Sequence, residues 1–272
     1  MVKTIGVISI KGGVGKTTVT TNLGAVLANE FNKKVLIVDA NFSAPNLGLH
    51  LGVVKPEKST IHDVVLGKVA PEKATYIHDA GFHFMPGSLV SSGSVDVHAL
   101  KKKLRDFKNN YDIVLIDSSP TLNSEILATM LASDELLVVT SPDYPTLSCT
   151  IRAIKLAKQR NTPITGLVLN KKKGKNFELG LKDIEELSDV PVIAVLPDTD
   201  KVLEALANAT PAVLYEPNHD ISAEYKKLAA CLIGEKFKDK RLGAQLKNLF
   251  SFGKIEKQDA NRAAVYKDRI KV

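Results

Sequence analysis

The sequence predicts an α/β protein whose doubly wound, mainly parallel sheet carries helices on both faces. Over residues 1–234, short runs rich in β-branched residues alternate with longer segments of helical periodicity, an order typical of repeated right-handed βαβ units. Several of the short runs are apolar on both faces, such as IVLI at 113–116 and LLVV at 136–139, as strands buried inside a parallel sheet are. A length of 272 residues with 44% hydrophobic and 25% charged residues suits one large globular domain, with or without an appendage.

The same pattern places the individual elements. The expected strands cover residues 4–10, 34–39, 82–85, 111–117, 135–140, 165–170 and 191–196. The expected helices cover residues 16–31, 96–109, 122–132, 146–160, 177–188, 199–208 and 220–234. In such sheets ligands bind outside the carboxyl ends of the strands, so we look for unusual chemistry there. The glycine-rich loop and two aspartates follow or end the first, second and fourth expected strands.

The composition excludes several classes of protein. Cys149 and Cys231 are the two cysteines and lie far apart, which predicts neither a disulfide framework nor a thiolate metal site. No run approaches the roughly 18 continuous apolar residues of a membrane span, and the apolar start is too short for a signal peptide. We therefore expect a cytoplasmic protein.

The positive charge is concentrated at the C-terminus. Residues 235–272 hold eleven Lys and Arg against five Asp and Glu, so they supply +6 of the net charge of +7. We therefore expect a globular domain at 1–236 and a basic tail at 237–272 that meets an anionic surface, although a solvated terminus has the same composition.

A glycine-rich loop follows the first strand and precedes the first helix. The loop reads KGGVGKTT, and the residues expected to bind a nucleotide are Gly12, Gly13, Val14, Gly15, Lys16, Thr17 and Thr18. Glycines let successive backbone N–H groups curl around phosphate oxygens, and the helix N-terminus adds positive potential. Lys16 would reach the β- and γ-phosphates, and the Thr17 hydroxyl would complete the coordination of Mg²⁺. The general pattern GxxxxGK[ST] has Gly where this chain has Ile10, so the loop departs from the standard form.

Two acids end buried strands near this loop. Asp117 stands where a carboxylate holds the Mg²⁺ shell, although it would equally cap the helix that follows. Asp39 would bind the Mg²⁺ water shell or position the attacking water. Thr17, Asp39 and Asp117 are thus the expected metal site.

With the extra lysine at Lys11, the loop resembles the deviant Walker A motif of the MinD/ParA ATPases, and the resemblance extends over about residues 1–234. The segment DANFSAPNLG at 39–48 resembles switch I, and the four residues from Asp117 to Pro120 resemble the start of switch II. TSPD at 140–143 with the following helix is similar to the MinD branch. Asn170, followed by a lysine, is similar to the adenine-contacting Asn of the family, and Pro197 and Asp198 lie where the family closes the adenine pocket.

The resemblance implies that ATP and Mg²⁺ are the cofactors and that the ATP-bound protein is a homodimer. Lys11 then crosses to the phosphates of the partner, where a second ammonium neutralises charge during phosphoryl transfer. Without the resemblance, the simpler interpretation of Lys11 is a solvated lysine of the loop. The catalytic residues implied are Lys11, Lys16, Asp39 and Asn41.

Two departures from the family pattern predict slow, partner-dependent or absent hydrolysis. Switch I of the family usually reads Asp-x-Asp, and here Asn41 replaces the second Asp. An amide can hold a water molecule but cannot accept its proton. In switch II, Thr121 stands where MinD proteins have a glycine whose N–H faces the γ-phosphate.

The basic tail contains an amphipathic pattern at about 240–254. Leu242, Leu246, Leu249 and Phe250 recur at helical spacing, with Lys247 among the residues that lie elsewhere on the wheel. Such a helix can lie in a membrane interface, and two copies on a dimer gain avidity. MinD proteins end in a comparable targeting helix, which implies peripheral binding to anionic lipid on the inner face of the cell membrane. A further polar extension follows at 255–272, and packing of the apolar stripe against the body or a partner protein is the alternative.

The favoured interpretation is a MinD-like switch that positions a partner in cell division or another spatial process. Three other interpretations compete with it. A ParA-like DNA segregation ATPase would use the tail with Lys171, Lys172, Lys173 and Lys175 to bind DNA, but the nearly neutral body makes nucleic acid the weaker partner. An iron–sulfur protein would need paired cysteines as cluster ligands, which this chain lacks. A scaffold that binds ATP without hydrolysing it is compatible with Asn41.

Overall fold

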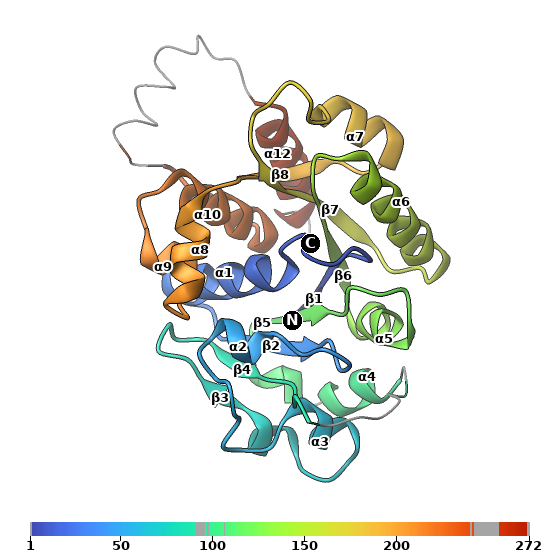
Figure 1. Cartoon of the computed structure of the whole chain (residues 1–272), viewed down its shortest axis with the longest axis vertical. Helices are drawn as coiled ribbons and strands as arrows, with labels where there is room; N and C mark the ends of the chain where they lie inside the picture. The colour runs from blue at the N-terminus through green and yellow to red at the C-terminus, as the bar shows by residue number, and fades with distance from the viewer. Residues whose placement is uncertain are drawn as a thin grey trace.

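The computed structural model confirms the α/β class, with one sheet between two layers of helices (Figure 1). It describes residues 2–90, 96, 98–105, 107–239, 241 and 256–270. The strands are β1 (Lys3–Ile8), β2 (Val35–Ala40), β3 (Tyr76–Ile77), β4 (His83–Met85), β5 (Ile113–Ser118), β6 (Glu135–Thr140), β7 (Ile164–Lys172) and β8 (Val192–Pro197). Their order across the sheet is β3-β4-β2-β5-β1-β6-β7-β8, and the short edge strand β3 runs antiparallel to its neighbour whereas the other pairs are parallel. The first strand therefore lies near the middle of the sheet, beside β5.

Helices cover both faces of this sheet. They are α1 (Lys16–Asn29), α2 (Leu47–His50), α3 (Ile61–Val65), α4 (Ala99–Leu104), α5 (Ser124–Ala132), α6 (Tyr144–Gln159), α7 (Leu181–Ser188), α8 (Asp200–Ala207), α9 (Ala212–Tyr215), α10 (Asp220–Ile233) and α12 (Lys257–Ile270). Short 3₁₀ turns lie at Pro71–Ala74 and Phe107–Asn110. Helices α1 and α10 lie on one face, and α5 and α6 lie on the other (Figure 1).

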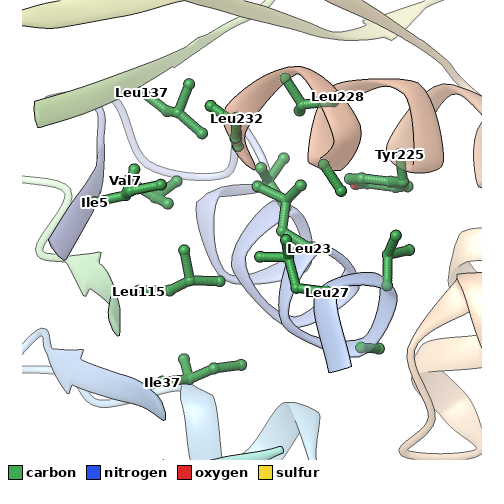
Figure 2. Packing of buried hydrophobic residues seen from close by; sticks show 14 of the residues in the cluster. Ile5, Val7, Leu23, Leu27, Ile37, Leu115, Leu137, Tyr225, Leu228 and Leu232 are labelled. Atoms are coloured by element: carbon green, nitrogen blue, oxygen red, sulfur yellow. The ribbon is translucent and has the colours of Figure 1, made fainter. Parts of the chain in front are cut away.

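The core is largest between the sheet and the helices α1 and α10. Leu23 and Leu27 of α1 are fully buried, and Figure 2 shows them between Leu115 of β5 and the α10 residues Tyr225 and Leu228. Burial of apolar side chains on both sides of the sheet explains why its strands read as continuous apolar runs. This packing fixes α1, and with it the loop that precedes α1.

Several elements differ from their predicted bounds. The helix predicted at 96–109 is shorter, with α4 at 99–104 and a separate 3₁₀ turn after it. Strand β3 was not predicted because a two-residue edge strand has no measurable period. The helices α2, α3 and α9 were missed for the same reason, since none of them exceeds five residues.

The polar extension after residue 255 forms a helix, α12, which the sequence pattern did not predict. This helix packs on β8 and α10. The Asn261 side chain donates to the Val192 carbonyl at 2.8 Å, and the Arg262 guanidinium donates to the Glu224 carboxylate at 2.6 Å. Polar contacts hold much of this helix and Val265 adds an apolar contact with the core, so its apolar periodicity is too weak for a search of the sequence to find. A division of the chain at residue 236 stays a prediction.

Candidate nucleotide-binding site

The loop between β1 and α1 is shaped by its glycines. Gly13 and Gly15 have φ angles of +75° and +95°, in the left-handed region that residues with a side chain avoid. A Cβ on Gly15 would collide with the side-chain amide of Asn170, so a larger residue there would have to displace Asn170. Gly15 is the N-cap of α1, and the free N–H groups of the first helical turn follow it. The loop thus forms an anion cradle at a helix N-terminus.

Lys16 is the first residue of α1, and it is buried with 7% of its surface exposed. Burial lowers the pKa of its ammonium, and the Asp117 charge raises this pKa in part. Helix α1 is described in full, and its first turn holds no acidic residue that would neutralise the helix end. A buried ammonium and an uncompensated helix N-terminus together favour a polyanionic ligand such as a nucleotide phosphate.

Asp39 and Asp117 lie side by side because β2 and β5 are neighbouring strands and the two residues are paired in register. Burial raises the pKa of Asp39 to about 8, with a further rise from the Asp117 charge, while backbone N–H groups of Leu47, Asn41 and Asn46 lower it. Burial also raises the pKa of Asp117 to about 6, opposed by the Thr17 hydroxyl and the Lys16 ammonium. Two adjacent buried carboxyls, of which only Asp117 is stabilised by the Lys16 charge, favour the binding of a cation beside them.

The residues present fit a bound Mg²⁺. The Thr17 hydroxyl donates to Oδ2 of Asp117 at 2.6 Å, so both oxygens face one point. Within the described residues, Oδ1 of Asp117 and Oδ1 of Asn41 are buried and have no hydrogen-bond partner. Buried polar atoms are nearly always satisfied, and oxygen ligands are those that Mg²⁺ prefers. Thr17 and Asp117 are therefore the side chains that would hold the ion beside the phosphates.

We expect the substitution Asp117→Asn to stabilise the nucleotide-free protein, and to do so more at pH 8 than at pH 5. The raised pKa of each acid means that its protonated form favours folding below about pH 4, and that this contribution is lost as the pH rises to about 6 for Asp117 and about 8 for Asp39. Removing one charge of the pair relieves this loss, and the variant amide can still accept from Thr17. The gain at pH 8 should be on the order of 1–2 kcal/mol.

Thermal unfolding without nucleotide or metal, from pH 5 to pH 9, measures this effect. Asp268→Asn, at an exposed position on α12, is the matched control and should show no such pH dependence. A melting-temperature difference for Asp117→Asn that is constant across this range would contradict the assignment.

The carboxylate of Asp39 holds the switch I segment together. Its Oδ1 accepts from the Asn41 N–H at 3.1 Å, and its Oδ2 accepts from the N–H groups of Asn46 at 3.1 Å and Leu47 at 3.0 Å. The Asn41 amide nitrogen donates to the Ala44 carbonyl, so its Oδ1 is left for a ligand. Asp39 thus positions Asn41, a role that the sequence pattern did not separate from metal binding.

In switch II the N–H of Thr121 donates to the Ser119 hydroxyl at 3.3 Å. This N–H was expected to face a γ-phosphate, and in this structure it is engaged inside its own loop. Binding of a phosphate there would have to break this hydrogen bond.

The residues expected on the nucleobase side gather behind the phosphate loop. The Asn170 amide donates to the Val14 carbonyl at 2.7 Å, and the Lys171 ammonium donates to the Gly13 carbonyl at 2.7 Å. At the end of β8, the Asp198 N–H donates to the Lys172 carbonyl at 2.9 Å, which brings Pro197 and Asp198 next to the end of β7. The structure therefore places all of these residues near the carboxyl ends of the strands, beside the phosphate loop. Their contacts to a nucleobase stay predictions.

Lys11 and Lys16 differ in their surroundings although both belong to the loop. Lys11 is exposed. Burial raises the pKa of nearby Asp143, but hydrogen bonds from Ser141 and Thr146, with a smaller contribution from the Lys11 charge, lower it overall. An exposed lysine at the loop is free to meet phosphates of another molecule. Lys16 is held inside its own site.

Two residues that sequence reasoning did not single out for this site also contact switch I. His62 is buried, and its Nε2 lies 2.9 Å from the Phe42 carbonyl, while its Nδ1 accepts from the Ser88 N–H. Glu125 is buried on α5, and its carboxylate accepts from the Ser43 hydroxyl at 3.2 Å. Neither residue belongs to a motif, and only the fold brings them to the loop.

The residues expected to bind a membrane, Leu242, Leu246, Lys247, Leu249 and Phe250, lie outside the described residues. In the part of the chain that is described, no helix combines the length and the apolar character that crossing a bilayer requires. Membrane contact stays a prediction from the sequence.

Comparisons with known proteins agree on one family. A family model described as an AAA domain matches residues 2–165. An uncharacterized ATP-binding protein of Methanocaldococcus jannaschii is 34% identical over 245 residues, which cover 89% of this chain and 90% of that protein. The septum site-determining protein MinD of Thermotoga maritima is 30% identical over 240 residues, with 85% and 88% covered. The solved structure of MinD from Pyrococcus horikoshii, complexed with Mg-ADP, superposes with a TM-score of 0.78 at 31% identity and covers 85% of this chain and 96% of that one.

Proposed function

We propose that this chain is a switch that forms a dimer when it binds ATP and dissociates into monomers after hydrolysis. The chain belongs to the MinD/ParA family of P-loop ATPases, and within it to the MinD branch. The observation that carries the proposal is the contrast inside the phosphate loop. Lys16 is buried in its own site, whereas Lys11 is exposed and available to a second molecule. Dimerisation would report the nucleotide state to other components, in cell division or another process of spatial positioning.

ATP and Mg²⁺ are the cofactors of this family member, in agreement with the Mg-ADP complex of the Pyrococcus protein. A bound Mg²⁺ neutralises charge on the phosphate oxygens as the γ-phosphoryl group is transferred. For this chain, Lys16 and the N–H groups of α1 would bind the phosphates, and Thr17 and Asp117 would hold the ion. Asp39 would fix Asn41, whose free Oδ1 would hold a water molecule.

Large apolar side chains are exposed near the carboxyl ends of the strands, on the side of the sheet where the phosphate loop lies. Leu122, Tyr144 and Phe177 are 60%, 70% and 83% exposed, and each follows the carboxyl end of a strand, β5, β6 or β7. Large apolar side chains exposed at one edge of a soluble domain mark a site of association. They support a second copy of the chain as the partner across the nucleotides.

Sedimentation of the full chain tests the dimer. With Mg²⁺ and a non-hydrolysable ATP analogue at saturation, we expect the mass of two chains, and with ADP the mass of one. A chain that stays monomeric with the saturated analogue would rule out the proposed switch.

We propose that ATP hydrolysis is slow because Asn41 has an amide that cannot accept a proton. The substitution Asn41→Asp should therefore accelerate hydrolysis. A carboxylate at this position, held by the Asp39 contact to the backbone, would accept the proton that an amide cannot. Phosphate release should rise by roughly 100-fold, which is the lower end of the range for general acid–base catalysis. Fast release by the unmodified protein, unchanged by the substitution, would contradict this role of Asn41.

The basic tail is proposed to bind anionic membrane surfaces through the apolar stripe at 242–250. Two stripes on a dimer would bind a membrane far more strongly than one, so ATP would control residence there. The double substitution Leu246→Glu, Phe250→Glu should therefore abolish flotation with vesicles rich in phosphatidylglycerol in the presence of ATP. The control Asn248→Glu, Ser251→Glu adds equal charge outside the stripe and should lose much less binding. Flotation of neither nucleotide state, or equal losses in both variants, would exclude the apolar stripe as the anchor.

DNA binding is the competing proposal, and the structure weakens its support. Lys171 donates to the Gly13 carbonyl, Lys172 lies 3.2 Å from the Glu178 carboxylate, and Lys173 lies 3.5 Å from the Asp198 carboxylate. Three of the lysines counted for DNA contact thus have partners within the chain. A gel shift that requires ATP and weakens steeply with salt would restore the DNA proposal.

A further inference from the structure

Glu125 is a buried carboxylate that the proposed mechanism does not use. It is the second residue of α5, directly after the switch II segment, and 7% of its surface is exposed. Its Oε2 accepts a hydrogen bond of 3.2 Å from the hydroxyl of Ser43, which lies two residues after Asn41. A buried carboxylate is costly unless it is hydrogen-bonded, and the N-terminal turn of a helix lowers that cost.

The contact adds a side-chain link between two parts of the nucleotide site that follow the neighbouring strands β2 and β5. Switch I is fastened to β2 through Asp39 and to α3 through the contact of His62 with Phe42. Among the hydrogen bonds of the described residues, the one from Ser43 to Glu125 ties residues 41–47 to α5. Helix α5 in turn begins where switch II ends, with its first turn capped by Asn123. This pair therefore links switch I to the helix that follows switch II.

We propose that Glu125 is a positioning residue, which holds Ser43 and so fixes the switch I segment that carries Asn41. The inference rests on the proposed function, because it assigns to Glu125 the placement of a group used in ATP hydrolysis. Asn41 does not accept a proton, so the rate depends on how accurately its free Oδ1 holds the attacking water. The Glu125 carboxylate on α5 thus orders the switch I segment, in which Asn41 stands at the position of the second Asp of the family.

The first measurement needs no hydrolysis. Hydrogen exchange of the nucleotide-free full chain is compared for wild type, Glu125→Ala, Ser43→Ala and the double variant. We expect the N–H groups of Asn41, Asn46 and Leu47, which donate to Asp39, to exchange about tenfold faster in each single variant, because a charge-assisted hydrogen bond is lost. The double variant should exchange no faster than the single variants, since both remove one contact. Glu186→Ala, at an exposed position on α7, is the control and should leave these amides unchanged.

The second measurement concerns turnover. In Glu125→Ala and Ser43→Ala we expect kcat for ATP to fall about tenfold while KM changes less than about twofold, and Glu125→Gln should recover part of the rate because its amide oxygen still accepts from Ser43. A general loss of helix stability would instead speed exchange along α5 and leave Ser43→Ala without effect, which would overturn the proposal. So would an unchanged kcat in both single variants. If the wild-type protein hydrolyses no ATP, that result contradicts the hydrolysis step of the proposed function, and the exchange of residues 41–47 alone decides whether Glu125 positions switch I.

Discussion

Replacing Lys16 with alanine is expected to weaken the binding of ATP with Mg²⁺ by at least about 100-fold, equivalent to about 2.7 kcal/mol. Lys16 is the buried cation of the phosphate loop, and the fold holds it there before any ligand arrives. Burial lowers the pKa of Lys16 although the Asp117 charge opposes this, and negative phosphates would stabilise the ammonium further. A charge-assisted contact in such a dry site is worth more than one on the surface.

Titration with a fluorescent ATP analogue measures the affinity, and two other lysines serve as comparisons. Lys102→Ala, on the exposed side of α4, should bind like the wild type. Lys11→Ala should also bind ATP to within a few fold, but it should lose the dimer in sedimentation because its exposed ammonium is proposed to serve the partner copy. If Lys16→Ala retains its affinity within about fivefold, the phosphates lie elsewhere. If Lys11→Ala still dimerises, the proposed crossing of Lys11 is wrong.

The sequence was sufficient for the sheet and for the phosphate loop because both are local patterns. Strands buried on both faces leave continuous apolar runs, and the loop requires glycines at Gly13 and Gly15, where the backbone has positive φ angles. The comparisons and the structure confirm this fold class and the family. The pairing of Asp39 with Asp117 was less accessible, because it follows from the order of β2 and β5 in the sheet. Sequence reasoning predicted both acids, but not that burial raises both pKa values or that the Asp117 charge raises the pKa of Asp39 further.

Other features had no signal in the sequence. His62 and Glu125 act on switch I from α3 and α5, at separations along the chain that no motif spans. Helix α12 was missed because it is attached by charged and amide groups, which in a sequence resemble a solvated terminus. A basic tail therefore conceals one helix that packs on the body through its polar residues.

This attachment leads to the second large effect, a loss of about 3–5 kcal/mol of stability in the variant Arg262→Ala. Arg262 is 6% exposed and donates to Oε1 of Glu224 at 2.6 Å and to the Ile193 carbonyl at 2.9 Å. Burial alone would lower its pKa, but the charges of Glu224 and Asp259 raise it, so the guanidinium stays charged. Removal of the side chain leaves the buried Glu224 carboxylate with Lys227, 4.0 Å away, as its remaining cation, and the poorly compensated charge accounts for most of the loss.

The variant Glu224→Gln separates the poorly compensated charge from the lost contact. Its amide oxygen can still accept from the Val195 N–H, which the carboxylate does at 3.1 Å, but it carries no charge. Glu224→Gln combined with Arg262→Ala should therefore regain roughly half of the stability that Arg262→Ala loses. Lys267→Ala, at an exposed position on the same helix, should stay within about 0.5 kcal/mol of wild type in urea unfolding.

The way in which Arg262→Ala loses stability shows whether α12 unfolds together with the rest of the chain or before it. If the helix unfolds only together with the body, Arg262→Ala lowers the midpoint of the whole urea transition. If α12 detaches first, Glu224 regains water, the body keeps most of its stability, and proteolysis within 256–270 becomes faster. The ion pair of Arg269 with Glu135, 2.6 Å long at the start of β6, favours the first outcome because it ties the end of α12 to the central part of the sheet. An Arg262→Ala protein that matches wild type within about 1 kcal/mol, and resists protease equally, would show that the buried ion pair does not hold α12 in place.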